Sequence, residues 1–97
     1  MVEQPQRLEV SVSNVFDAIP DDARVLIIKE LERRNPALLQ DLRTSAKPTN
    51  AQSDGVVLGV LAPALQETFG PDYTPDEYGL SVERAIDAYL EAWPIHR

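Results

Sequence analysis

Residues 74–93, TPDEYGLSVERAIDAYLEAW, are the clearest element of this 97-residue chain. Thr74 to Glu77 match a capping box, with threonine at the N-cap, proline at the first helical position and a glutamate that reaches back. The apolar positions then follow the spacing of one helix face: Val82, Ala85, Ile86, Tyr89, Leu90 and Trp93. We expect an amphipathic helix that ends before Pro94, with Gly79 as the position where its first turn could separate.

Residues 21–34, DDARVLIIKELERR, predict a second helix. Acids lie in its first turn and basic residues in its last, which suits the helix macrodipole at both ends. Its helical spacing is marked by Leu26, Ile27, Glu30 and Leu31. Val25 and Ile28 widen the apolar arc, so we expect this helix to be central and to pack against more than one neighbour.

The middle of the chain predicts two more helices. Asn35 and Pro36 form a helix start, and its apolar face is Leu38, Leu39, Leu42 and Ala46. Residues 47–54, KPTNAQSD, read as a loop. For residues 55–69 we prefer a helix that is capped by Asp54 and kinked at Pro63, and a strand over 56–61 is the alternative.

The N-terminal residues predict an arm outside the helical domain. Residues 1–12 are expected to be flexible or extended, with alternating apolar residues from Leu8. A short helix over residues 13–19 would end at Pro20. The expected fold is therefore all-α, a compact bundle of four or five short helices, with residues 13–97 as one domain.

Charge is distributed unevenly along the chain. Residues 1–23 sum to −4, residues 24–47 to +3 and residues 48–97 to −6, which gives the formal net charge of −7. Nucleic acid is not expected as a partner, because its binding depends on neutralising phosphates. Whether the basic segment 24–47 makes a functional face stays open; ion pairs within the helix, such as Glu30 with Arg34, are the simpler interpretation.

Several chemistries lack the residues that they require. The chain has no cysteine, and His96 is its only imidazole, which leaves the serines without a base and zinc without ligands. A calcium loop that begins at Asp72 would place Glu77 where glycine is required. We therefore expect no metal, no cofactor and no catalytic residue. The N-terminal residues lack a signal pattern and no segment is a membrane-span candidate, so we expect a cytoplasmic protein.

Two surface features are candidate sites for a protein partner. Glu83, Asp87 and Glu91 recur every four residues and make an acidic stripe on the polar side of the last helix. Asp72, Tyr73 and Tyr78 lie in an acidic corner that capping does not explain, where tyrosines could anchor an interface. The alternatives are a solvated helix face and tyrosines that pack over the helix start.

The second half of the chain resembles acyl carrier proteins over about 40 residues. Asp54-Gly55-Val56 would open a helix that ends in residues 65–70, LQETFG, and residues 75–77, PDE, and 85–90, AIDAYL, follow. The resemblance implies a small acidic helical domain. Gly55 stands at the position of the phosphopantetheine serine, so no functional residue is carried over.

These observations predict a non-catalytic protein-interaction module, of an inhibitor or immunity-like kind, that binds a basic partner. An acyl-carrier-like domain without the phosphopantetheine serine is the alternative. The sequence leaves open whether the chain forms homo-oligomers.

Overall fold

The structure is a computed structural model that describes residues 14–70 and 75–95. Its elements are a 3-10 turn η1 (Val15–Ala18), α2 (Asp21–Arg34), α3 (Pro36–Arg43), α4 (Asn50–Val56), a π-helical segment η2 (Val57–Leu61), α5 (Ala62–Gln66) and α6 (Glu77–Ala92). Because α4, η2 and α5 follow without a break, they form one long helix. The predicted all-α fold is confirmed for the described residues, and the arm predicted over 1–12 lies outside them.

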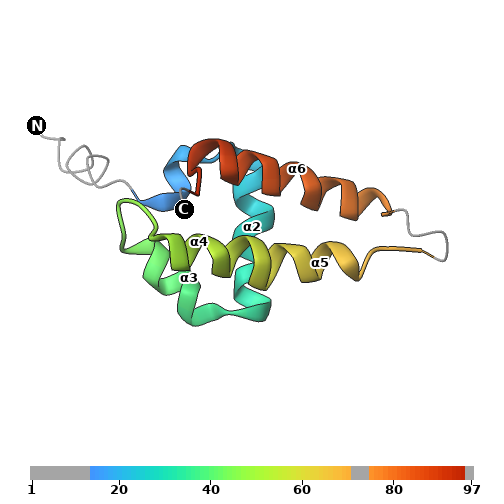
Figure 1. Ribbon diagram of the computed structural model, residues 1–97, viewed down its shortest axis with the longest axis horizontal. Helices are drawn as coiled ribbons and strands as arrows, with labels where there is room; N and C mark the ends of the chain where they lie inside the picture. The colour runs from blue at the N-terminus through green and yellow to red at the C-terminus, as the bar shows by residue number, and fades with distance from the viewer. Residues whose placement is uncertain (1–13, 71–74, 96–97) are drawn as a thin grey trace, which may run out of the picture.

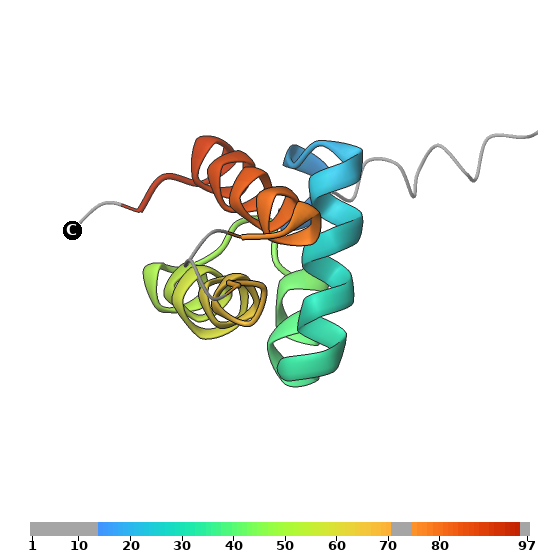
Figure 2. The ribbon, with the colours of Figure 1, turned by 90° about the vertical axis from the view of Figure 1, so that its right-hand side faces the viewer.

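Two long helices lie side by side, and a third crosses both. Figure 1 shows α6 above the continuous helix α4–η2–α5, with α2 passing behind them. In Figure 2 these two helices are seen nearly end-on, while α2 stands upright beside them. Since α2 contacts α6, α3 and η2, its predicted central position is confirmed. Val25 does not extend its buried arc, because this side chain is 65% exposed.

Each helix contributes to one core. Tyr89 of α6 is fully buried, and its hydroxyl lies 2.8 Å from the Oγ of Ser53, which is also buried. This hydrogen bond satisfies two polar groups within the core and joins α4 to α6. The predicted apolar face of the last helix is confirmed, since Val82 and Ala85 are also buried there and Ile86, Leu90 and Trp93 pack against them.

Pro63 is accommodated by a change of helix type. The Ala62 N–H donates to the carbonyl of Val57, five residues earlier, so the turn before the proline is wider than an α-turn. A proline ring needs room opposite the carbonyl four residues before it, and a widened turn is one way to relieve that contact. The preferred helix is therefore confirmed from Gly55 to Gln66, with a π-helical turn before Pro63, and the alternative strand over 56–61 is wrong.

The continuous helix α4–η2–α5 begins at Asn50, earlier than the sequence predicted. Its N-cap is Thr49, whose Oγ1 accepts from the Gln52 N–H at 3.0 Å, while the Gln52 side chain accepts from the Thr49 N–H. Residues 50–54 were predicted as loop, but this reciprocal cap makes them helical. The helix start at Asp54 and Gly55, on which the resemblance to acyl carrier proteins depended, is wrong.

The start of α6 also differs by two residues. Asp76 is the N-cap, with its carboxylate accepting from the Gly79 N–H at 2.9 Å. The predicted cap Thr74 lies outside the described residues, and Glu77 is the first helical residue. An aspartate is at least as good a cap as a threonine, which explains the shift. The helix continues through Gly79 without a break.

The N-terminal turn is shorter than the helix predicted over 13–19. Asn14 and Asp17 form a reciprocal cap around η1, and Ile19 is already extended, as expected before Pro20. The Trp93 indole N–H donates to the Val15 carbonyl at 2.9 Å, which fastens η1 to the end of α6.

Gly79 allows α6 to approach the end of α5 closely. A Cβ at this position would lie 2.2 Å from the Thr68 Oγ1 and 2.6 Å from the Pro75 Cβ. We expect Gly79→Ala to lower the free energy of unfolding by about 1–3 kcal/mol, because overpacking outweighs the gain in helix propensity. Urea unfolding followed by Trp93 fluorescence measures this change.

Gly59 provides the matched control, since a Cβ there meets no atom within 4 Å. Gly59→Ala should be neutral or stabilise by up to about 1 kcal/mol. Equal effects of the two substitutions would contradict a steric role for Gly79.

Candidate functional site

Glu30 is a charged side chain buried in the interior. It lies on α2 among the core positions and has no exposed surface. Burying an ionised carboxylate is costly unless other groups compensate its charge and hydrogen-bonding capacity. The groups that contact the Glu30 carboxylate therefore indicate whether this residue has a chemical role or stabilises the fold.

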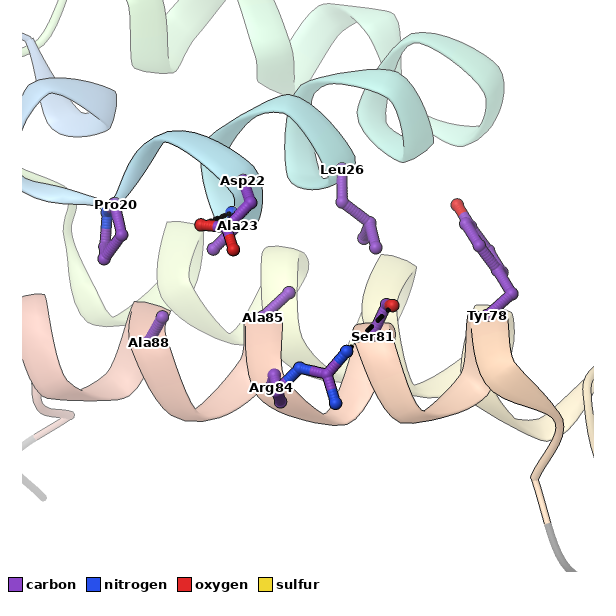
Figure 3. Close-up of a pocket in the computed structure, with 9 residues that line it drawn as sticks. All are labelled: Pro20, Asp22, Ala23, Leu26, Tyr78, Ser81, Arg84, Ala85 and Ala88. Atoms are coloured by element: carbon purple, nitrogen blue, oxygen red, sulfur yellow. Dashed lines mark hydrogen bonds between the residues drawn. The ribbon is translucent and has the colours of Figure 1, made fainter.

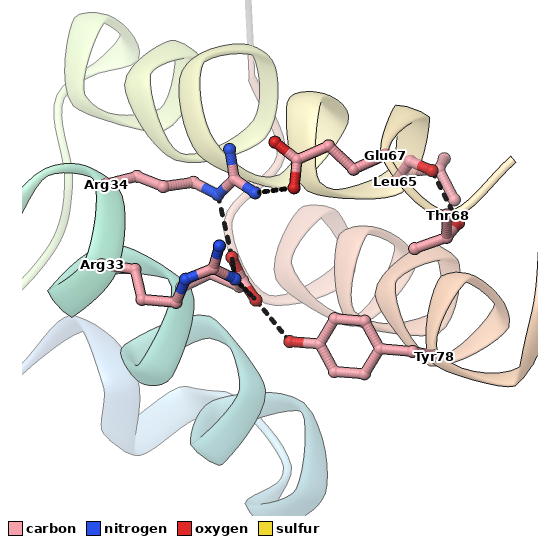
Figure 4. A network of polar contacts seen from close by, with 7 residues as sticks. Arg33, Arg34, Leu65, Glu67, Thr68 and Tyr78 are labelled. Atoms are coloured by element: carbon pink, nitrogen blue, oxygen red, sulfur yellow. Dashed lines mark hydrogen bonds and ion pairs between the residues drawn. The ribbon is translucent and has the colours of Figure 1, made fainter.

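Three side chains compensate the Glu30 carboxylate. Arg34 donates through Nε at 2.9 Å, Arg33 lies at 3.2 Å, and the Tyr78 hydroxyl of α6 donates to Oε2. Arg34 also donates to Glu67 at 2.6 Å, just after α5. Figure 4 shows how these contacts connect α2 with both long helices. The predicted pair of Glu30 with Arg34 is confirmed.

The pKa directions follow from these contacts. Burial raises the pKa of Glu30, but the hydrogen bonds from Tyr78 and Arg34 and the charges of both arginines outweigh it, so the pKa lies below 4.5. Burial, together with the hydrogen bond to Glu30, raises the pKa of Tyr78 to about 12. The hydrogen bond from Arg34 lowers the pKa of Glu67. At neutral pH the network thus holds two carboxylates, two guanidinium groups and a neutral phenol.

This network has the properties of a structural clamp. Its central carboxylate is inaccessible, and two of its donors have a further partner: Arg34 pairs with Glu67, and Tyr78 is contacted by Lys29. Lys29 lies over the Tyr78 ring, with Nζ 5.0 Å from the centroid, which adds a cation–π contact between α2 and α6. This role was not predicted, although a glutamate at a core-spaced position of α2 was a signal for it.

The predicted partner-binding residues separate into three groups. Asp72 and Tyr73 lie outside the described residues. Tyr78 is half-buried, and its hydroxyl is used by the clamp. The third group is exposed and makes no ion pair within the described part of the chain: Glu83, Asp87 and Glu91.

A groove of about 320 Å³ lies between α2 and α6. Its lining residues are Pro20, Asp22, Ala23 and Leu26 from α2 and its N-cap, and Tyr78, Ser81, Arg84, Ala85 and Ala88 from α6 (Figure 3). The alanines leave space between the two helices, while Asp22 and Arg84 place opposite charges on its two walls. Nothing in the sequence indicated this groove, because it depends on how the helices cross.

Comparisons with family models, curated proteins and solved structures find no match for this chain. In residues 14–70 and 75–95, histidine, cysteine, aspartate and glutamate side chains nowhere form a group of three that could bind a metal ion. None of the described helices combines the length and the hydropathy that a membrane span requires.

The clamp predicts a large loss of stability when its carboxylate is removed. Glu30→Gln should lower the free energy of unfolding by about 3 kcal/mol, because the partly buried Arg34 guanidinium and Tyr78 phenol lose their charged acceptor. Tyr78→Phe should cost about 2 kcal/mol, since it removes one hydrogen bond to a charged group. Urea unfolding measures both variants and the double variant.

Glu32→Gln is the matched control, because Glu32 is exposed on the same helix. It should change stability by less than about 0.5 kcal/mol. The double variant should cost less than the sum of the single changes, since both remove the same contact. If the stability losses of the two single variants summed to that of the double variant, Glu30 and Tyr78 would not interact, which would contradict the clamp.

The clamp also predicts a dependence of stability on pH. The folded pKa of Glu30 is below the unfolded value, so its contribution is complete above pH 4.5 and is lost as the pH falls through the folded pKa. Glu67 adds to the same trend. Unfolding free energies at a series of acidic pH values should fall more steeply for the wild type than for Glu30→Gln. Parallel curves would contradict a lowered pKa for Glu30.

Proposed function

We propose that the chain is a non-catalytic protein-interaction module whose acidic stripe, Glu83, Asp87 and Glu91, binds a basic surface of a partner protein. The observation that carries this proposal is the grouping of three exposed carboxylates on one face of α6, none of which makes an ion pair within the described residues. Elsewhere in the structure, Asp21 pairs with Arg24, and Glu30 and Glu67 pair with Arg34. The stripe has no such neutralising contact within the described residues.

Arg84 lies on the same helix as the acidic stripe but makes no ion pair with it. Arg84 is next to Glu83 and three residues before Asp87, a spacing that permits an ion pair along a helix. Its guanidinium instead donates to the Ser81 Oγ at 3.2 Å, on the wall of the groove. The stripe therefore presents its full negative charge to the solvent.

Like charges at this spacing carry a cost in the free protein. Each pair of carboxylates four residues apart destabilises a helix by about 0.2–0.5 kcal/mol. A basic partner would relieve this repulsion and add attraction, and a concentrated acidic surface also accelerates the encounter with such a partner. The net charge of −7 favours the same kind of partner.

The double variant Glu83→Lys, Asp87→Lys tests the stripe. Wild-type protein immobilised as bait should retain a partner from the lysate of its own cells at about 0.1 M salt and release it at about 1 M, where charges are screened within about 3 Å. The retained partner, once purified, should bind the double variant at least about tenfold more weakly in titrations, because two attractive charges become repulsive.

Glu32→Lys with Asp41→Lys is the matched control, because it changes the same residue types and the same net charge at exposed sites on α2 and α3. Its affinity for the partner should stay within about twofold of the wild type. Equal losses in both double variants would show that only the net charge matters. A partner that withstands high salt and reversal of the stripe would refute the proposal.

No specific observation favours the carrier alternative. Gly55 lies inside α4 rather than at a helix start, and Ser53 is buried against Tyr89. The chain therefore presents no accessible serine at the position that the resemblance required.

A further inference from the structure

The groove between α2 and α6 carries a second inference, independent of the acidic stripe. Asp22 and Arg84 are charged residues on its opposite walls, and neither makes an ion pair within the described residues. Asp22 accepts from the Ala23 N–H, and Arg84 donates to Ser81, so each uses only a neutral local partner. Figure 3 shows the two side chains on the helices that border the groove.

Apolar side chains extend this surface beyond the groove. Val25 is 65% exposed and follows Asp22 by three residues, and Leu80 is 44% exposed and precedes Arg84 by four. On a helix, residues three or four apart are surface neighbours. Each charged wall is therefore flanked by an exposed aliphatic side chain, and Leu26, Ala85 and Ala88 line the space between them.

We infer that a second copy of this chain covers the groove in a two-fold symmetric dimer, in which Asp22 of each copy faces Arg84 of the other. In a two-fold interface, the same patch meets itself and every contact occurs twice. A patch with one acid and one base on opposite walls is self-complementary under this symmetry. The dimer then gains two ion pairs around a central apolar contact.

The charge of the whole chain restricts where two copies can meet. With a net charge of −7, most of the surface repels an identical molecule. The groove is an exception, because its single acid and single base balance. A basic partner would instead favour an unbalanced acidic surface. The local balance of the groove thus argues for a second copy as its occupant.

The dimer patch borders the acidic stripe on α6, since Leu80 precedes Glu83 by three residues and Arg84 precedes Asp87 by three, but it contains none of the three carboxylates of the stripe. Glu83, Asp87 and Glu91 do not line the groove. The dimer would present two stripes, and a partner with two basic sites would bind both with a higher effective affinity. The dimer does not require the proposed function to be correct, since it concerns different side chains.

Two charge reversals test the dimer. Sedimentation equilibrium over a concentration series should give a monomer–dimer equilibrium for the full wild-type chain. Asp22→Arg and Arg84→Glu should each raise the dissociation constant by about tenfold or more, because each change replaces two attractive pairs by two repulsive ones. Circular dichroism should show unchanged helicity, since both side chains are on the surface.

The two variants also test each other. An equimolar mixture should form a mixed dimer, because the arginine introduced at position 22 of one chain then faces the glutamate introduced at position 84 of the other. The native pair of Asp22 with Arg84 occurs at the second contact of this mixed dimer. The double variant Asp22→Arg, Arg84→Glu should dimerise alone, with a dissociation constant within about threefold of the wild type. This recovery would not occur if either substitution had merely damaged the fold.

Asp41→Arg and Arg43→Glu are the matched controls, since they make the same changes in charge at exposed positions of α3. Both should leave the dissociation constant within about twofold of the wild type. A chain that is monomeric at every concentration would overturn the inference. So would a dimer that survives both reversals, or single variants whose mixture does not associate.

The variant Glu83→Lys, Asp87→Lys separates this inference from the proposed function. It should weaken binding to a basic partner at least about tenfold and leave the dimer intact. Loss of the dimer in this variant would place the interface on the stripe and overturn the assignment to the groove.

Discussion

The buried carboxylate of Glu30 is the constraint on which the arrangement of the helices depends. An ionised group without solvent contact needs partners in fixed positions, and these come from α2 itself, from α6 and, through Arg34, from the end of α5. Apolar contacts alone tolerate small sliding movements of one helix along another. Hydrogen bonds to a buried charge do not, because each displaced donor leaves that charge less compensated. The clamp thereby fixes how α2 crosses the two long helices.

The sequence predicted the elements better than their boundaries. The faces of α2 and α6 were predicted because long amphipathic segments repeat their apolar spacing over several turns. Both misplaced helix starts arose where two capping residues compete within a few positions: Thr49 with Asp54, and Asp76 with Thr74. Local sequence ranks such caps about equally, so the reciprocal contact that Gln52 adds decides one of them in the folded chain.

The candidate sites were predicted unevenly for a related reason. The stripe Glu83, Asp87 and Glu91 follows from helical spacing alone, so its exposed position could be predicted. The clamp could not, because Tyr78 lies 48 positions from Glu30 and nothing local links them. The groove depends on the crossing of α2 and α6, and hence on the clamp. The clamp and the groove were therefore not predicted because both depend on contacts between segments that are distant in the sequence.

The contact between Trp93 and Val15 bears on the order in which the fold assembles. It joins residues 78 positions apart, so forming it directly from the unfolded chain would close a long loop at a large cost in chain entropy. Contacts within and between neighbouring helices span far shorter loops and form first. Once those helices have packed, η1 and the end of α6 are already near each other, and little entropy remains to be lost. We therefore expect the hydrogen bond between the Trp93 indole and the Val15 carbonyl to be among the last contacts of the described residues to form.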